Sequence, residues 1–176
     1  MVHAHRFRIY LPRSAAIPLR ASLTPTGILT TPDGNEWLHC SGAATLAHEN
    51  TRRHLSTSTC VGGWNFTFPP APSGAIPSEV FDDEKVLHVN GANIALKHYA
   101  PAHTDGDISV HFSQADVLHV GNTLWNGHYP FIDYSTGGSI DGMIRATQAN
   151  LAKSQKSSQA TVLWAIRLNS PSIAIS

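Results

Sequence analysis

The chain has 176 residues, of which 41% are hydrophobic and 14% are charged, and its basic and acidic residues balance at 12 each. This length suits one domain with a sizeable core, and the balanced charge gives no sign of a nucleic acid or anionic membrane as partner. Cys40 and Cys60 lack the spacing of a metal-binding pair. No apolar run approaches the ~18 residues of a transmembrane helix, and the basic start lacks the apolar centre of a secretory signal, so the compartment is undetermined.

Residues 1–32 differ from the rest of the chain. They contain four arginines and no acidic residue, and their apolar positions follow neither a helical nor a strand period. From Asp33 onward the pattern becomes regular. It predicts a helix near 34–41, a strand near 43–47 and a second helix from about residue 49, followed by a long Pro- and Gly-rich loop over 60–78.

Strands dominate the middle of the chain. Residues 78–89 and 92–100 flank Asn90-Gly91, a dipeptide that suits the positive φ angles of a tight hairpin turn. Two shorter strands are expected over 107–112 and 116–121. His88, His98, His111 and His119 fall on these strand patterns, which favours cross-strand or supporting roles for them.

A helix is expected after the glycine turn at 137–138, with Ser139 as its N-cap. Its partial apolar stripe consists of Ile140, Met143, Ile144 and Leu151. Residues 160–168 predict a last apolar strand. Strands mixed with helices in this order indicate a layered α/β protein.

His103 is the first candidate for chemistry, because it lies in the loop between two expected strands. A rigid sheet would hold it at the mouth of a cleft, where metal ligands and general bases are found. A surface histidine with a single hydrogen bond fits the same position. Asp105 and Asp107 in "HTDGD" fit ordinary turn chemistry as well as a metal site.

Several long blocks of the sequence carry a family resemblance. They are "DGNEWLH", "AHENTRRHLS", "AHTDGDISVHF", "ADVLHVGNTLWNGHYPFIDYSTGGSIDGMI" and "ANLAK". Together they resemble the metallo-β-lactamase-like hydrolases, over roughly Asp33 to Lys153, and are most similar to the branch of metal-dependent hydrolases that do not degrade antibiotics.

The resemblance implies an α/β fold, the αββα metallo-β-lactamase-like sandwich, here only partial, with N-terminal strands and the C-terminal part missing or scrambled. It also implies two zinc ions that lower the pKa of bound water to about 7 and supply hydroxide for hydrolysis. The substrate would be a small molecule with an ester, amide, thioester or phosphate bond.

Carried over position by position, the family's metal ligands are mostly absent from this chain. His103 matches a ligand histidine, but Asn122 replaces the aspartate that bridges both ions, and an amide nitrogen offers a metal no lone pair. The His-x-His-x-Asp-His loop should precede Asp33, where Thr26–Thr31 holds no ligand. No histidine follows Ile166 in place of the last ligand.

A shifted reading frame explains the lost loop. The codons ACC CAC TGG CAT TTT GAC CAC ACC encode Thr-His-Trp-His-Phe-Asp-His-Thr. Read one base later, they encode Pro-Thr-Gly-Ile-Leu-Thr-Thr-Pro, which is Pro25–Pro32 of this chain. Leu23-Thr24 matches the shifted reading of Ile-Asn in the same way. Chance similarity with a free choice of synonymous codons is the alternative.

These observations divide the chain into three parts: a leader over 1–32 outside the family pattern, a metallo-β-lactamase-like core over 33–159, and a divergent tail over 160–176. Two functions stay open. The chain is a zinc-dependent hydrolase whose activity is lost or impaired, or it is a non-catalytic remnant or small-ligand-binding protein. Missing strands would expose a sheet, so self-association is expected.

The candidate substrate cleft has further residues. Asp105, Trp125, His128 and Tyr129 lie in the loops beside His103 and Asn122, as do the aromatic residues Phe131 and Tyr134. They would form a wall against an organic substrate, and plain core or loop packing accounts for them equally well. His48 and Glu49 indicate the end of a strand that leads into a helix.

Overall fold

Two β-sheets form the centre of the molecule, as the computed structural model shows for residues 21–24, 34–125, 127–153, 156–158 and 165–167. The first sheet has three parallel strands in the order β1-β2-β5. They are β1 (Ala21–Leu23), β2 (Ala44–His48) and β5 (Glu79–Phe81).

The second sheet has the order β11-β10-β9-β8-β7-β6. Its neighbouring strands are antiparallel except for the parallel pair β9 and β10. Asn90 and Gly91 turn β6 into β7 with φ angles of 51° and 74°, as the sequence predicts. The strands are β6 (Glu84–Val89), β7 (Ala92–His98), β8 (Ile108–Phe112), β9 (Val117–His119), β10 (Lys156–Ser158) and β11 (Ala165–Arg167).

The hydrophobic core lies between the two sheets. Leu46 and Phe81 from the three-stranded sheet pack against Leu96, Ile108 and Val110 from the six-stranded one, and Leu96 is 1% exposed. The alternating strand positions bury one face of each sheet here. Burial of these side chains between the sheets is the main favourable contribution to folding.

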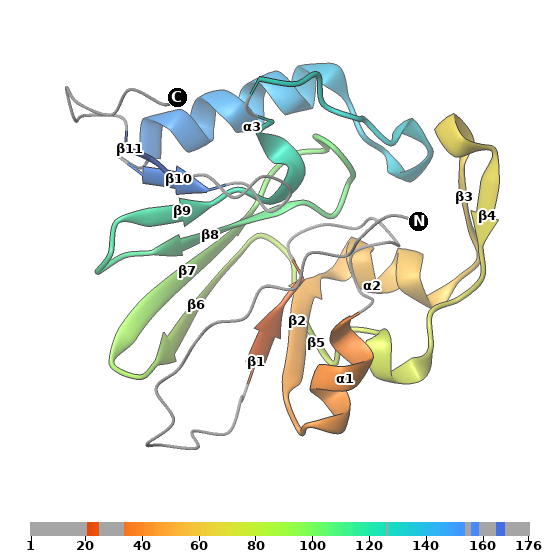
Figure 1. The fold of residues 1–176 in the computed structure, drawn as a ribbon, viewed down its shortest axis with the longest axis horizontal. Helices are drawn as coiled ribbons and strands as arrows, with labels where there is room; N and C mark the ends of the chain where they lie inside the picture. Colours follow the sequence, from red (N-terminus) through yellow and green to blue (C-terminus); the bar gives the residue numbers. More distant parts are fainter. Residues whose placement is uncertain (1–20, 25–33, 126, 154–155, 159–164, 168–176) are drawn as a thin grey trace.

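Helices flank both sheets (Figure 1). The helices α1 (Asn35–Cys40) and α2 (Glu49–Ser56) pack against β2, and α3 (Ile140–Lys153) lies along the far side of the six-stranded sheet. Under α3, a second apolar cluster joins Met143 and Ala146 to Tyr99 and Ala102. The order of layers is therefore helix, sheet, sheet, helix, which is the α/β sandwich expected from the sequence.

The predicted loop over 60–78 is partly wrong. It contains β4 (Phe66–Phe68), which pairs with β3 (Thr59–Val61) as a small antiparallel hairpin, and a 3-10 turn at Ser73–Ala75. The hairpin forms because its alternate residues are aromatic or β-branched, a preference that the surrounding Gly and Pro residues hide in a sequence window.

The predicted strand over 78–89 is two strands in different sheets. β5 pairs with β2, and after Asp82 and Asp83 the chain enters β6 and pairs with β7. A strand pattern within one stretch of sequence cannot show this change of sheet, because the pairing partners are distant in sequence.

The helix expected after the glycine turn is present as α3, but the apolar stripe that predicted it is not the buried face. Met143 is 4% exposed, whereas Ile140, Ile144 and Leu151 are 50%, 51% and 44% exposed. The buried face consists of small and polar residues instead, namely Gly142, Ala146 and Asn150, because the helix packs closely on backbone. Ser139 does cap α3, since its Oγ accepts the Gly142 amide hydrogen at 3.3 Å.

The ends of the chain contribute strands to both sheets. β1 lies within the leader at residues 1–32, although no strand pattern is visible there in the sequence. β11 falls inside the strand expected over 160–168, of which only Ala165–Arg167 is among the described residues. In the described part of the chain, no helix has both the length and the apolar character that crossing a membrane requires.

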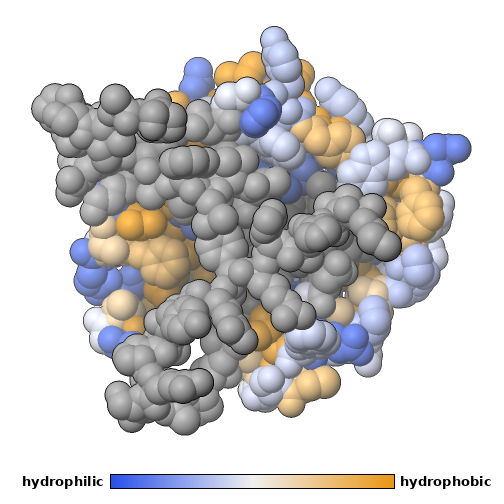
Figure 2. Space-filling view, viewed as in Figure 1, coloured by the Kyte–Doolittle hydropathy of each residue, from blue (hydrophilic) through white to orange (hydrophobic). Residues whose placement is uncertain are grey.

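Apolar side chains also reach the surface. Figure 2 shows hydrophobic residues on this face over the six-stranded sheet and at the β3–β4 hairpin. On the sheet, Val86, Val89 and Phe112 are 53%, 37% and 37% exposed, and on the hairpin Phe66 is 53% exposed.

Candidate functional site

The loop between β7 and β8, residues 99–107, carries the polar residues of the candidate site and is called the His103 loop below. Backbone hydrogen bonds hold it to the segment before α3: the Asp133 amide donates to the His103 carbonyl at 2.9 Å, and the Asp105 amide donates to Thr136 at 2.9 Å. A Cβ at Gly138 would lie 2.4 Å from the same His103 carbonyl, so only glycine permits this close approach.

His103 is completely buried, at 0% exposed, so the expectation of a histidine at the mouth of a cleft is wrong for this structure. Its Nδ1 lies 3.4 Å from Asp107 Oδ1, and its Nε2 lies 3.4 Å from the amide nitrogen of Asn122. The sequence correctly places His103 and Asn122 side by side, although 19 residues separate them.

These two contacts fit one tautomer of His103. The carboxylate of Asp107 accepts, so Nδ1 carries the hydrogen, and the Asn122 amide nitrogen donates, so Nε2 offers its lone pair. The lone pair that a metal ion would need is therefore directed at an N–H group. An aspartate at position 122 would leave that lone pair to a cation.

Asp107 is more than a turn residue. It is 0% exposed, and its carboxylate accepts from the Thr104 amide at 2.7 Å and from the Thr104 hydroxyl at 3.1 Å. Charge-assisted bonds of this kind are about twice as strong as neutral ones. Asp107 thus fixes the turn of the His103 loop and orients the His103 ring.

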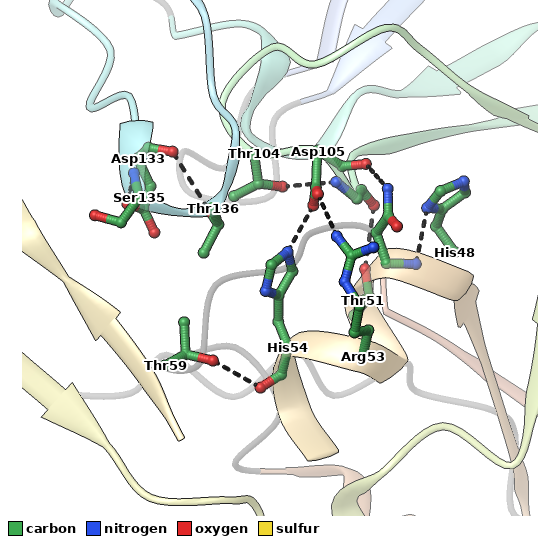
Figure 3. Close-up of polar contacts among 12 residues, drawn as sticks. His48, Thr51, Arg53, His54, Thr59, Thr104, Asp105, Asp133, Ser135 and Thr136 are labelled. Carbon is green, nitrogen blue, oxygen red and sulfur yellow. Dashed lines mark hydrogen bonds and ion pairs between the residues drawn. The ribbon is translucent and has the colours of Figure 1, made fainter. Parts of the chain in front are cut away.

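Asp105 faces α2 rather than a substrate (Figure 3). Its Oδ1 lies 2.8 Å from His54 Nε2 and its Oδ2 lies 2.8 Å from Arg53 Nη2. The side chains of Asp105 and His54 are 16% and 14% exposed. The Arg53 ion pair and the His54 contact attach the His103 loop to α2. No sequence pattern indicates these contacts, because Arg53 and His54 lie about 50 residues away from Asp105.

Asn122 sits in a 3-10 turn at Gly121–Thr123 directly after β9. Its backbone carbonyl accepts from Trp125 Nε1 at 2.9 Å. The neighbouring His119 accepts the Gly121 amide hydrogen at Nδ1, 3.3 Å away, and burial lowers the pKa of its imidazole.

The remaining cleft candidates are dispersed. Trp125 packs with the cluster under α3. His128 is exposed, and Tyr129 is 99% exposed, so Tyr129 forms no wall of a site. Phe131, which the sequence grouped with them, instead contacts His103 edge-on at 6.2 Å and stacks on Trp64 at 5.3 Å.

The described residues do not fit a pair of metal ions. Zinc sites require at least three protein ligands, and no three His, Cys, Asp or Glu side chains gather around a possible ion among the residues placed by the structure. At the expected site stand His103 and Asn122, whose amide is aimed at the histidine nitrogen. The expected ligand loop, 26–31, lies outside the described residues and contains no ligand residue type.

The layers, the strand order and the position of the His103 loop at one edge of the sandwich define an αββα two-sheet protein. The same architecture occurs in crystal structures of DIM-1 metallo-β-lactamase exposed to ceftazidime (TM-score 0.60, 17% identity, covering 84% of this chain and 62% of that one) and of BLEG-1 B3 metallo-β-lactamase (TM-score 0.66, 16%, 85% and 73%). It occurs also in TTHA1623 in a di-iron-bound form (TM-score 0.62, 15%, 86% and 73%).

The chain therefore has the metallo-β-lactamase fold, as its sequence blocks predict. It spans less than two thirds of the DIM-1 chain, at 62%. No protein-family model matches the chain, and no curated protein matches it significantly.

Proposed function

We propose that this chain derives from a zinc-dependent hydrolase and that, as its sequence now reads, it has lost paired metal binding and hydrolysis. The observation that carries this proposal is the contact of the Asn122 amide with His103 Nε2 at 3.4 Å, in the place where the resemblance requires two metal ligands. The di-iron form of TTHA1623 supports a metal-dependent origin without specifying zinc.

Two variants of the chain test the loss of metal binding directly. The first variant replaces Pro25–Pro32 by Thr-His-Trp-His-Phe-Asp-His-Thr and carries Asn122→Asp. The second, a matched control, has the same eight-residue replacement but keeps Asn122, so the two differ in one side chain. Zinc per chain is measured by mass spectrometry after dialysis against zinc and then against buffer, with hydrolysis of p-nitrophenyl acetate as a second readout.

The unchanged chain is expected to retain well below one zinc ion and to leave the ester unhydrolysed. The variant with Asp at position 122 should retain more zinc than its control, because a carboxylate can bridge two cations and an amide cannot. The proposal is wrong if the unchanged chain keeps about two zinc ions and hydrolyses the ester.

The reading-frame explanation has its own test. The coding DNA from the start codon through the Asn35 codon is sequenced at high depth and read in all three frames. A neighbouring frame that encodes His-Trp-His-Phe-Asp-His supports an inherited metal site. If no frame encodes it, residues 1–32 are genuine sequence and this origin of the lost ligands is wrong.

A second candidate function is binding of a small aromatic ligand, and the aromatic contacts favour it. Trp64 is 45% exposed and stacks on Phe131, which reaches His103. The probe is phenyl acetate at millimolar concentration. Its binding is measured as broadening of the NMR signals of phenyl acetate when the protein is added. Broadening that is lost in Trp64→Ala but kept in Trp37→Ala supports this function, since Trp37 is exposed on α1.

A further inference from the structure

Two histidines stack on each other where the two sheets meet. His48 ends β2 in the three-stranded sheet, and His98 ends β7 in the six-stranded sheet. Their ring centroids are 3.7 Å apart and their planes differ by 17°. Two parallel imidazoles at this distance are compatible only while at most one carries a charge, because like charges repel strongly at short range.

His48 needs to be neutral for a second reason. It is the N-cap of α2, and its Nδ1 accepts the Asn50 amide hydrogen at 3.2 Å. A protonated imidazole has hydrogens on both nitrogens and accepts nothing. Protonation would also place a cation at the positive end of the helix dipole. The side chain is 4% exposed, and no hydrogen-bond partner for its Nε2 is found among the described residues.

His98 holds the His103 loop directly. Its Nδ1 lies 3.0 Å from the carbonyl oxygen of Asp107, and a carbonyl only accepts, so Nδ1 carries the hydrogen. The remaining ring nitrogen of His98 is the one that protonation would charge. A charge there would be stacked on His48.

The groups that face His48 come from three elements. His98 faces it from β7, Asp82 from the turn after β5 at 3.8 Å, and Asp105 from the His103 loop, while Phe81 of β5 presents an apolar edge. Burial and the neighbouring His98 lower the pKa of His48, and the backbone of Asp82 together with the Asp82 and Asp105 carboxylates opposes this shift only in part. Asp82 is 94% exposed, so water screens its charge.

The first turns of α2 are the other anchor of the His103 loop (Figure 3). Asn50 Nδ2 donates to the Asp105 carbonyl at 2.8 Å, and the Thr51 hydroxyl donates to the Gly106 carbonyl at 3.2 Å. Arg53 and His54 hold the Asp105 carboxylate. His48 thus acts on the loop through α2, and His98 acts on it through Asp107.

We propose that His48 and His98 form a pH-sensitive latch, in which protonation of the stacked pair releases the start of α2 and the His103 loop together. Above the ordinary histidine pKa, about 6.5, His48 is neutral and the latch is closed. In the closed state His48 binds a proton weakly, whereas in the open state it binds a proton as an ordinary histidine does. Closure is therefore lost progressively as pH falls from about 6.5 toward the lowered pKa of His48 in the closed state.

Hydrogen exchange at the Asn50 and Asp105 amides, expressed as protection factors to remove the intrinsic pH dependence, tests the latch. Protection should fall by up to about tenfold per pH unit between pH 6.5 and the pKa of the closed state, the limit for one proton. His48→Asn keeps a side-chain oxygen that caps α2 at every pH. Its protection should not change over the same range. His88→Gln removes a histidine of β6, whose Nδ1 bonds the Asn93 side chain, and should behave like the unchanged protein.

The latch is refuted if the unchanged protein keeps the same protection across this range, or if His48→Asn loses protection as the unchanged protein does. Should His48→Asn fail to fold, the ring of His48 is titrated in the unchanged protein by carbon-detected NMR. A His48 pKa at or above about 6.5 would then overturn the proposal, and a lower one would uphold it.

Discussion

The substitution Gly142→Ala isolates the contact between α3 and the His103 loop. A Cβ at Gly142 would lie 1.6 Å from the Pro101 carbonyl oxygen and 2.7 Å from its carbonyl carbon. Real Cβ contacts are essentially never below 3.0 Å, so the helix or the loop must move by at least 1.4 Å, the difference between 3.0 and 1.6. Both contacts are with backbone, which cannot rotate away as a flexible side chain does.

Two effects of opposite sign compete in this variant. Alanine favours a helix over glycine by about 1 kcal/mol, whereas forcing an extra methyl into a packed site costs about 1–3 kcal/mol and more when backbone must shift. A movement above 1 Å belongs to the upper end, so we expect a net loss of about 2 kcal/mol or more in the free energy of unfolding.

Urea unfolding followed by circular dichroism measures this loss. Gly34→Ala is the matched control, because Gly34 has φ −92° and nothing within 4 Å of its added Cβ. It should change the stability by less than about 0.5 kcal/mol. If Gly142→Ala is as stable as the unchanged protein, or more stable, the close packing of α3 on Pro101 is incorrect.

Three further substitutions test other parts of the fold. Leu96→Ala, at 1% exposed in the core between the sheets, should lower the unfolding free energy by about 2–5 kcal/mol, and a loss as small as that of the exposed control Val86→Ala would contradict the core. Asp105→Asn removes the carboxylate charge that Arg53 and His54 contact, so the free energy of unfolding in urea should fall by about 1–2 kcal/mol. The control Asp83→Asn, at an exposed aspartate, should leave the free energy of unfolding almost unchanged. Equal effects of the two substitutions would mean that the contacts of Asp105 do not stabilise the fold. We also propose that the edge strand β6 mediates self-association through Val86, which is 53% exposed. Val86→Lys should then lower the apparent mass in analytical ultracentrifugation. An unchanged mass would refute self-association through this edge strand.

The sequence predicted the helices and strands better than the contacts between them. The hairpin at Asn90-Gly91 was correct because positive φ is a local property of those two residues. The apolar stripe predicted the helix α3 but not its buried face, because the decisive feature is Gly142, whose missing side chain lets the helix approach Pro101. Hydrophobic periodicity does not register an absent side chain.

At the candidate site the same distinction holds. His103 and Asn122 could be paired from the family blocks, and they do meet. The partners of Asp105 could not be predicted, because Arg53 and His54 reach it only through the packing of α2 on the His103 loop. No regular spacing in the sequence relates these residues. The stacked His48 and His98 belong to two sheets, so their meeting depends on how the sheets face each other.

The strand β1 shows which changes of sequence a fold tolerates. Leu23 packs against the core, and Thr24 bonds the buried Asn35 side chain at 3.0 Å. On the shifted-frame hypothesis these positions once read Ile-Asn, so an apolar residue was exchanged for an apolar one and a hydrogen-bonding residue for another. The parallel pairing with β2 uses backbone groups that every residue supplies. A metal site has no such tolerance, because each ligand must be one of a few residue types at a fixed place. On the same hypothesis, the frame shift that preserved the strand would have removed every ligand of the loop after it.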